Sequence, residues 1–552
     1  MRSTFKAVTA TAFLALLAAS PALAGDPIRT IEILTRPQAS QPQEFQSVQL
    51  IAQEWRKLGL DVEVKVMPWE QMSDVVWYQR DTWDMTAWQM VGRPERSDPD
   101  EIVYNLFHSS TAENGYNFIG YTNPEYDKVA EAQRSEIDEE KRKELVFDAQ
   151  EMLAADQPNM MLVHPKQSFA FDKTVWKPES VVDQSGIGIR NTWTFMALEP
   201  AGETKDIILN SGDNVQAINP LYISGGVDSW VFELVYDRLA RVGPDGLPKP
   251  WAAESYEWRD ATTIDVKLRD GMKWHDGEAL TAEDVKFSFE TAVSGEAPMY
   301  APFASNIESI EVVDDLNLVF KLKAPAASFV TSSLAKINLI PMHVWEPIIA
   351  DLKTKDDQNA ENHQEDTPIG SGPFKFERWL TNEEIVLTAN TDHFNAPKAE
   401  RWILRIVPNV EAALGMLRSG EINFLAEFTG DPQVLLAAAE EDGDLEVVST
   451  VEMGFRYIAF NNRRAPFDDP AFRKALSAAV DRQLIVKAAF KGFAEPSNSV
   501  ISPALEFWHD PAVFEGFETG TDVAAKMLEE AGYTLDGDSL AYPGDKTEEL
   551  AK

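Results

Sequence analysis

Short runs of alternating apolar and polar residues, separated by a helical pattern, open the chain behind its first 24 residues. Residues 31–35 alternate as a short strand, and residues 62–66 alternate in the same way. Between them, apolar residues from 45 to 58 recur at helical spacing, and Gly59 follows as a helix stop. This order predicts a β-α-β unit with a crossover helix, which is typical of an α/β fold.

Two later segments carry information about domain organisation. Residues 128–155 predict one strongly charged helix, and Asn123-Pro124 marks the turn before it. Residues 199–205 have the composition of a linker. So short a linker can only join chain ends that already lie close together, because an extended residue spans at most about 3.5 Å.

The first residues predict an export signal. Arg2 and Lys6 give a positive start, residues 7–19 form a short apolar run, and Ala22-Leu23-Ala24 is a cleavage pattern. We therefore expect residues 1–24 to be removed and the protein to be periplasmic. No later stretch reaches the roughly 20 apolar residues that a membrane span needs.

Composition narrows the possible functions. The 552 residues are enough for two or more domains with separate cores. The net charge of −40 makes nucleic acid and anionic lipid poor partners. A cationic ligand and a merely solvated acidic surface both remain compatible with this charge, and the second is the simpler interpretation. The absence of cysteine excludes disulfides and thiolate chemistry.

One long block of the chain resembles a known family. Residues 250–258 (PWAAESYEW) and 266–288 (VKLRDGMKWHDGEALTAEDVKFS) resemble the signature of ABC importer solute-binding protein family 5, the peptide- and nickel-binding type. Physically this signature is structural: Asp276-Gly277 predicts a tight turn, and Thr281 predicts a helix N-cap followed by acidic residues. Further landmarks with the family's order are Asn219-Pro220-Leu221-Tyr222, Gly370-Ser371-Gly372-Pro373-Phe374, Tyr457-Ile458-Ala459-Phe460-Asn461 and Ala479-Val480-Asp481-Arg482.

The family landmarks expected last stand first in this chain, among residues 28–198. The resemblance therefore implies an α/β, two-lobed periplasmic-binding-protein fold (class II type, large cluster with an extra subdomain) that is circularly permuted. Two crossovers, near 84–90 and 399–405, would join the lobes. The predicted domains are 25–87 as the first part of lobe II, 88–402 as a continuous lobe I with its internal junction near 199–205, and 403–552 as the second part of lobe II.

The resemblance also suggests where a ligand binds. In peptide-binding members of the family, the segment just after a crossover resembles the motif Trp-x-x-Asp. The acid of this motif pairs with the α-amine of the bound peptide. This chain has Trp88 and Gln89 but Val91 in place of the acid, and Arg93 and Arg96 follow. Because arginine binds carboxylates with two parallel hydrogen bonds, this favours an anionic or carboxylated ligand. Surface pairing of both arginines with local acids is an equal alternative.

Arg456 is a second candidate, because the family lines its cleft with the strand before the Ala-Phe-Asn run; a solvent-facing residue on an alternating strand is the alternative. Tyr222 and Trp230 are candidates for stacking on a ligand, although core packing is the more common role of such aromatic residues. Asn117 and Tyr457 complete the predicted set of ligand contacts.

We therefore expect a receptor subunit that binds one small-molecule or short peptide-like ligand and delivers it to the transmembrane permease subunits of an ABC importer with a cytoplasmic ATPase. A ligand sensor or chaperone-like binding protein of the same fold is the alternative. No nucleophile–base pair, metal-ligand cluster or cofactor motif is present, so we predict no catalysis, no metal and no cofactor. The expected state is a monomer; a swapped dimer is the alternative.

Overall fold

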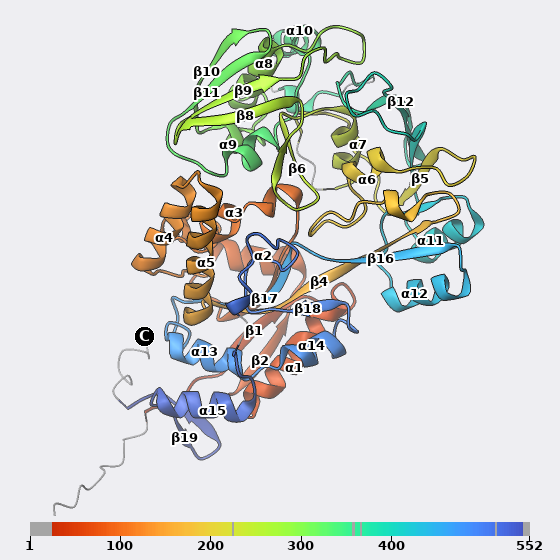
Figure 1. The fold of residues 1–552 in the computed structure, drawn as a ribbon. Helices are drawn as coiled ribbons and strands as arrows, with labels where there is room; N and C mark the ends of the chain where they lie inside the picture. Colours follow the sequence, from red (N-terminus) through yellow and green to blue (C-terminus); the bar gives the residue numbers. More distant parts are fainter. Residues whose placement is uncertain (1–24, 223–225, 356–358, 365–366, 514–515, 545–552) are drawn as a thin grey trace, which may run out of the picture.

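A computed structural model describes residues 25–222, 226–355, 359–364, 367–513 and 516–544. The predicted signal peptide and the end of the segment 403–552 beyond residue 544 lie outside the described residues. Figure 1 shows two stacked bodies. We call residues 25–165 and 452–544 the terminal lobe, and residues 166–451 the central lobe.

One large sheet runs through both lobes. Among the described residues it has twelve strands. Ten of them form a continuous hydrogen-bonded path, and the other two pair with β4. In spatial order the path is β12 (Phe374–Leu380), β13 (Glu384–Ala389), β14 (Arg401–Ile406), β5 (Asp206–Ser211), β15 (Phe424–Leu425), β4 (Asn159–Asp172), β17 (Phe455–Phe460), β3 (Met85–Met90), β1 (Ile31–Thr35) and β2 (Val62–Val66), with β16 (Leu445–Val451) and β18 (Ala494–Pro496) on β4.

Strand β4 passes from one lobe into the other. Its first half pairs antiparallel with β17, and its second half pairs antiparallel with β16. Pro165 lies where the partner changes, and proline has no N–H to donate to a ladder. Since β16 leads into β17 within a few residues, β4 and the β16–β17 segment are the two strands that connect the lobes.

The two ends of the chain share the core of the terminal lobe. Ile31, Ile33 and Trp55 from its first part pack with Ile458 and Leu476 from its second part. One face of β1 and β3 supplies this core, while Leu34 and Trp88 on the opposite face belong to a second core. The helices of this lobe are α1 (Pro42–Arg56), α2 (Trp69–Tyr78), α3 (Asp100–Val103), α4 (Pro124–Ser135), α5 (Glu139–Asp156), α13 (Pro470–Ala478), α14 (Arg482–Ala488) and α15 (Thr521–Glu530), with a hairpin of β19 (Thr534–Asp536) and β20 (Ser539–Ala541).

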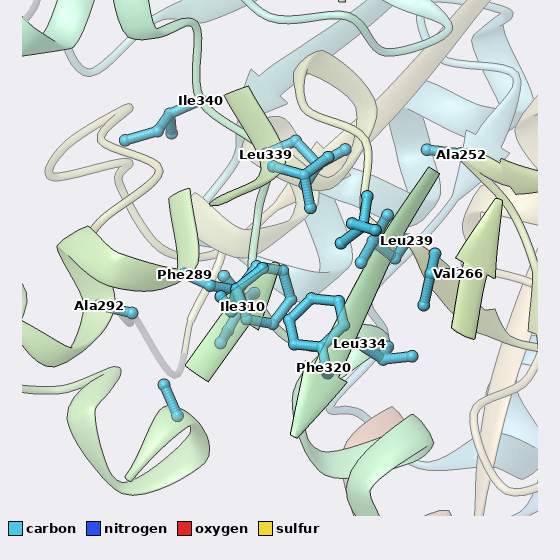
Figure 2. Close-up of a cluster of buried hydrophobic side chains, with 14 of the residues drawn as sticks. Leu239, Ala252, Val266, Phe289, Ala292, Ile310, Phe320, Leu334, Leu339 and Ile340 are labelled. Atoms are coloured by element: carbon cyan, nitrogen blue, oxygen red, sulfur yellow. The ribbon is translucent and has the colours of Figure 1, made fainter. Parts of the chain in front are cut away.

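The central lobe contains the upper half of the large sheet and a smaller sheet with its own core. Figure 2 shows that core, in which Phe289, Ile310 and Phe320 meet. The smaller sheet has the order β10 (Ile307–Asp314), β11 (Asn317–Leu322), β9 (Thr263–Leu268) and β8 (Ala253–Asp260); a two-stranded sheet pairs β6 (Ala240–Val242) with β7 (Pro248–Pro250). The helices are α6 (Thr192–Ala197), α7 (Asp228–Val235), α8 (Ala282–Val293), α9 (Ala301–Ala304), α10 (Met342–Leu352), α11 (Val410–Ser419) and α12 (Pro432–Glu441).

Several local predictions are confirmed. Strands β1 and β2 are parallel, as the β-α-β pattern predicted. Thr281 starts α8, and the Asp284 carboxylate accepts the Thr281 backbone N–H at 2.9 Å. Gly59 ends the segment after α1 with a φ of +83°, and a Cβ there would lie 2.9 Å from the Asp538 carbonyl oxygen. Glycine is therefore required both by the backbone conformation and by the close approach of the C-terminal hairpin.

Two expectations differ from the structure. The single helix over 128–155 is wrong, because the chain breaks between α4 and α5, where the Asp138 side chain accepts the Lys141 N–H and starts a new helix. The predicted lobe boundaries also differ from the observed cores. Residues 100–156 pack against the β3–β17 part of the sheet, and the strands that pass between lobes are not the segments 84–90 and 399–405.

Trp55 links the two parts of the terminal lobe. Its side chain is fully buried, and its Nε1–H donates to the Leu476 carbonyl oxygen at 2.9 Å. We expect Trp55→Ala to lower the free energy of unfolding by about 3–5 kcal/mol, because it removes a large buried ring and a buried hydrogen bond. Urea denaturation followed by circular dichroism measures the change. The exposed Tyr78→Ala should change it by only about 0.5 kcal/mol; equal effects would contradict this core.

Candidate functional site

A cavity of about 640 Å³ lies between the two lobes, on one side of the connecting strands. The terminal lobe contributes the first turn of α1, the middle of β17 and the segment after α14. The central lobe contributes the second half of β4, Arg190, Trp230 and residues 426–432 before α12. A site built from both lobes can bind a ligand more tightly when the lobes are closed than when they are apart.

Four of the predicted ligand contacts line this cavity: Trp88, Trp230, Arg456 and Tyr457. Trp88 is held by ring contacts with Trp69 at 4.9 Å and with other aromatic side chains. Burial raises the pKa of the Tyr457 hydroxyl, so this group stays protonated at neutral pH and keeps a hydrogen to donate.

Arg93 lines a smaller cavity of about 150 Å³ next to the large one, and Trp230 lies in the walls of both. Gln89 lines neither; its side-chain oxygen accepts a hydrogen bond from Arg36 at 3.2 Å. Arg96 also lies outside both cavities and donates to the backbone oxygen of Val91.

The two remaining predicted residues also lie outside both cavities. Asn117 is fully buried, and its amide nitrogen donates to the backbone oxygens of Phe107, His108 and Tyr121. These bonds hold a loop and leave that nitrogen no proton for a ligand. Tyr222 is half-buried, and its backbone N–H donates to the Asn219 oxygen at 3.2 Å.

Arg456 lies within a group of charges on the wall of the large cavity. Its side chain is 26% exposed, and its guanidinium is 3.7 Å from the Glu452 carboxylate. Arg36 and Glu44 form a second ion pair nearby. Burial lowers the pKa of Arg456, with the neighbouring Glu452 acting in the opposite direction. Arg456 is therefore partly engaged already, and a ligand carboxylate would compete with Glu452.

Arg190 is the cleft residue that sequence reasoning missed. Its guanidinium stacks on the Trp230 ring, 3.9 Å from the centroid. Its Nε is buried and has no hydrogen-bond partner among the described residues. Burial lowers the pKa of Arg190 to about 10, so the side chain is still charged at neutral pH. A charged donor without a partner at the junction of two cavities is a natural contact for an anionic ligand group.

The loop before Arg190 explains how it is held. Gly188 has a φ of +88°, and a Cβ at this position would lie 2.1 Å from the Phe169 ring. Gly186 has a φ of +73°, and a Cβ there would lie 2.7 Å from the Met453 Cβ. The pattern Gly-Ile-Gly-Ile-Arg was therefore the available signal: paired glycines mark a strained, closely packed loop, and an arginine follows directly.

The remaining walls combine aromatic, acidic and other polar residues. Phe169, Phe428, Phe490 and Phe493 supply ring surfaces, while Glu427 and Asp431 supply carboxylates. Lys491 of the terminal lobe pairs with Asp431 of the central lobe, so an ion pair joins the lobes at the rim of the cavity. Within the described ranges no group of three or more histidine, aspartate or glutamate side chains is arranged to hold a metal ion. None of the described helices is both long and apolar enough to cross a bilayer.

Comparison with known proteins identifies the family. The pattern described as "Bacterial extracellular solute-binding proteins, family 5 Middle" matches residues 248–551. The chain belongs to this family. Family 5 proteins bind solutes and are not enzymes, which agrees with the prediction of a binding protein in ABC transport.

Individual relatives match only part of this family 5 chain. The oligopeptide-binding protein AppA of Bacillus subtilis is 30% identical over 345 residues, which cover 61% of each chain. The glutathione-binding protein GsiB of Salmonella paratyphi A is 28% identical over 349 residues, covering 61% of this chain and 64% of GsiB. The chain thus spans less than two thirds of the length of these relatives.

Solved structures match to a similar extent. The AppA structure with a nonapeptide has a TM-score of 0.43 at 26% identity and covers 60% of this chain and 65% of AppA. CtaP of Listeria monocytogenes has a TM-score of 0.48 at 25% identity and covers 60% and 66%.

His164 makes the region of the connecting strands sensitive to acid. It lies on β4, fully buried, with Nδ1 2.9 Å from the Gly454 oxygen and Nε2 3.3 Å from the Ser499 oxygen. Burial lowers its pKa to about 4, against about 6.5 in an unfolded chain. The stability due to its neutral form is complete above about pH 6.5 and is lost as the pH falls toward 4.

We therefore expect the free energy of unfolding to fall between pH 6.5 and 4, with His164 contributing up to about 1.4 kcal/mol per pH unit. In His164→Gln this slope should be smaller, although His275, whose pKa burial also lowers to about 4, will maintain part of it. Denaturant titrations at several pH values measure the slope. An identical slope in both proteins would contradict this assignment.

Proposed function

We propose that this chain is the solute-binding receptor of an ABC importer, which holds a small organic solute between its two lobes and delivers it to the transmembrane permease subunits. The observation that carries this proposal is the cavity of about 640 Å³, whose walls come from both lobes and which lies beside their connecting strands. Family membership supports the same function. The relatives AppA and GsiB are named for binding oligopeptides and glutathione.

The proposed solute is peptide-like or otherwise carboxylated. Position 91, where peptide-binding members have an acid for the peptide amine, is a valine that is 48% exposed. Arg190 and Arg456 line the cavity, and Arg190 has an unsatisfied buried Nε. The phenylalanine residues that also line the cavity would cover apolar parts of the solute.

The proposal includes a circular permutation with the lobe limits taken from the hydrophobic cores. Two observations support it. Strand β3 pairs with β17, and β1, β3 and α1 share a core with α13 and α15 from the C-terminal part of the chain. The family match covers residues 248–551, and AppA aligns with 61% of each chain, as expected when two parts have exchanged their order. Such an exchange requires only that the original ends lay close together.

Residues 1–24 would then act as an export signal, which places the receptor in the periplasm, where it meets the permease and its ATPase partner. Closure within one chain gives a monomer. The lobes would open and close by bending at β4 near Pro165 and at the β16–β17 junction, since these are their shared strands.

The ligand contact at Arg190 can be tested directly. Native mass spectrometry of the exported protein should reveal one co-purified solute with an acidic group. Arg190→Gln should weaken its binding by about 1.5–3 kcal/mol in calorimetry, because a charge-assisted hydrogen bond is lost.

Arg418→Gln, on the exposed face of α11, is the matched control and should leave the affinity unchanged. Tight binding of neutral di- or tripeptides that is insensitive to Arg190→Gln would contradict the proposed contact. A folded protein that retains no solute and binds none from a broad panel would contradict the receptor function.

A further inference from the structure

The small cavity of about 150 Å³ next to the main cleft is lined by an unusual set of charges. Four arginines, Arg93, Arg190, Arg238 and Arg241, line it together with one acid, Glu233. The whole protein carries a net charge of −40, so this concentration of guanidinium groups is opposite in sign to the rest of the molecule. The cavity shares Gln167, Arg190 and Trp230 with the large one, which makes the two spaces neighbours.

The single acid balances only part of this charge. Glu233 lies 3.4 Å from Arg238, which also donates to the Asn338 side chain and the Ala335 oxygen. Arg238 is thus engaged by protein groups. Asp237, which is close enough to Arg241 to influence it, is bonded to the Trp251 indole at 2.7 Å and does not line the cavity.

Two of the other arginines have buried donors without partners. Arg241 is 5% exposed; its Nη2 donates to the backbone oxygens of Glu233 and Tyr236, but its Nε has no partner among the described residues. Arg190 has the same unsatisfied Nε. Because a buried charged donor without a partner is unfavourable, an acceptor within this cavity would be bound strongly.

The arginines come from both lobes. Arg93 follows β3 in the terminal lobe, while the other three belong to the central lobe. The backbone before Arg93 is held tightly, since a Cβ on Gly92 would lie 2.9 Å from the Gly454 nitrogen. An anion between Arg93 and Arg190 would therefore join the lobes by charge-assisted hydrogen bonds.

We infer that this small cavity is a subsite for a dianionic oxoanion group, phosphate or phosphonate in type, carried by the solute whose remainder occupies the large cavity. This inference rests on the proposed receptor function and specifies its substrate class. With Arg238 paired to Glu233, three further arginines line the cavity, so a dianion with several oxygen acceptors matches the site better than a single carboxylate. Because Arg93 comes from one lobe and Arg190 from the other, an anion bound by both would favour the closed form.

The test uses the full mature chain and inorganic phosphate as the first probe, by calorimetry at low ionic strength, with acetate for comparison. Phosphate should bind at least ten-fold more tightly than acetate. Arg93→Gln should weaken phosphate binding at least ten-fold. Arg418→Gln, on the exposed face of α11 and outside the cavity, should leave it unchanged. Unfolding temperatures verify that each variant is folded.

Phenyl phosphate distinguishes a phosphate group carried by an organic solute from free inorganic phosphate. Binding at least ten-fold tighter than that of inorganic phosphate indicates a group carried by an organic solute; equal affinities would overturn that part of the inference. If the protein binds its co-purified solute but neither phosphate nor phenyl phosphate, the subsite is wrong and the receptor function stands. If phosphate binds through Arg93 but no organic solute is ever retained, the subsite stands and the receptor function fails.

Discussion

The pairing of β4 with β16 and β17 is the interaction on which the two-lobed arrangement depends. One long strand provides a hydrogen-bonding edge to the terminal lobe in its first half and to the central lobe in its second half. Strands β4 and β17 both contribute to the wall of the cleft, and the loop with Gly186 packs on Met453 between β16 and β17. The change of partner at Pro165, which has no N–H for a ladder, makes this the natural point of bending.

Charge distribution then separates the binding region from the surface. The surface is strongly acidic, and most of its lysines pair with neighbouring acids. Inside the cleft, the Nε atoms of Arg190 and Arg241 have no hydrogen-bond partner in the part of the chain that the structure describes. In a partly buried site such donors are less screened by salt than surface charges, so in the proposed function they would select a negatively charged ligand group.

Much of the local structure could be predicted from sequence, because it depends on neighbouring residues. The alternation of apolar and polar residues in 31–35 and 62–66, the end of the first helix at Gly59 and the helix N-cap at Thr281 each depend on residues only a few positions apart. The break before α5 was missed because Asp138 lies in a charged stretch that also suits a helix. The family was recognisable from one long block, since its signature reflects strands and turns that follow each other in the chain.

The long-range features were harder to predict. In residues 159–172 the first half is mostly apolar and buried, whereas Lys166 and Gln167 after Pro165 are polar and partly exposed, and this local change does not reveal that the strand passes into the other lobe. Arg190 follows an irregular loop, so no periodicity marked it, and only the folded chain brings it against Trp230. Asn117 has the residue type of a ligand contact, yet its bonds to three backbone oxygens serve the loop in which it lies.

The central claim is that the solute holds two lobes together across strands that can bend. Because the chain has no cysteine, Ala39→Cys before α1 and Val434→Cys on α12 would place two spin labels, one on each lobe, at exposed positions beside the cleft. Pulsed electron paramagnetic resonance then measures the distance between them. We predict that saturating co-purified solute gives a shorter and narrower distance distribution than the solute-free protein. Identical distributions with and without bound solute would contradict closure of the lobes.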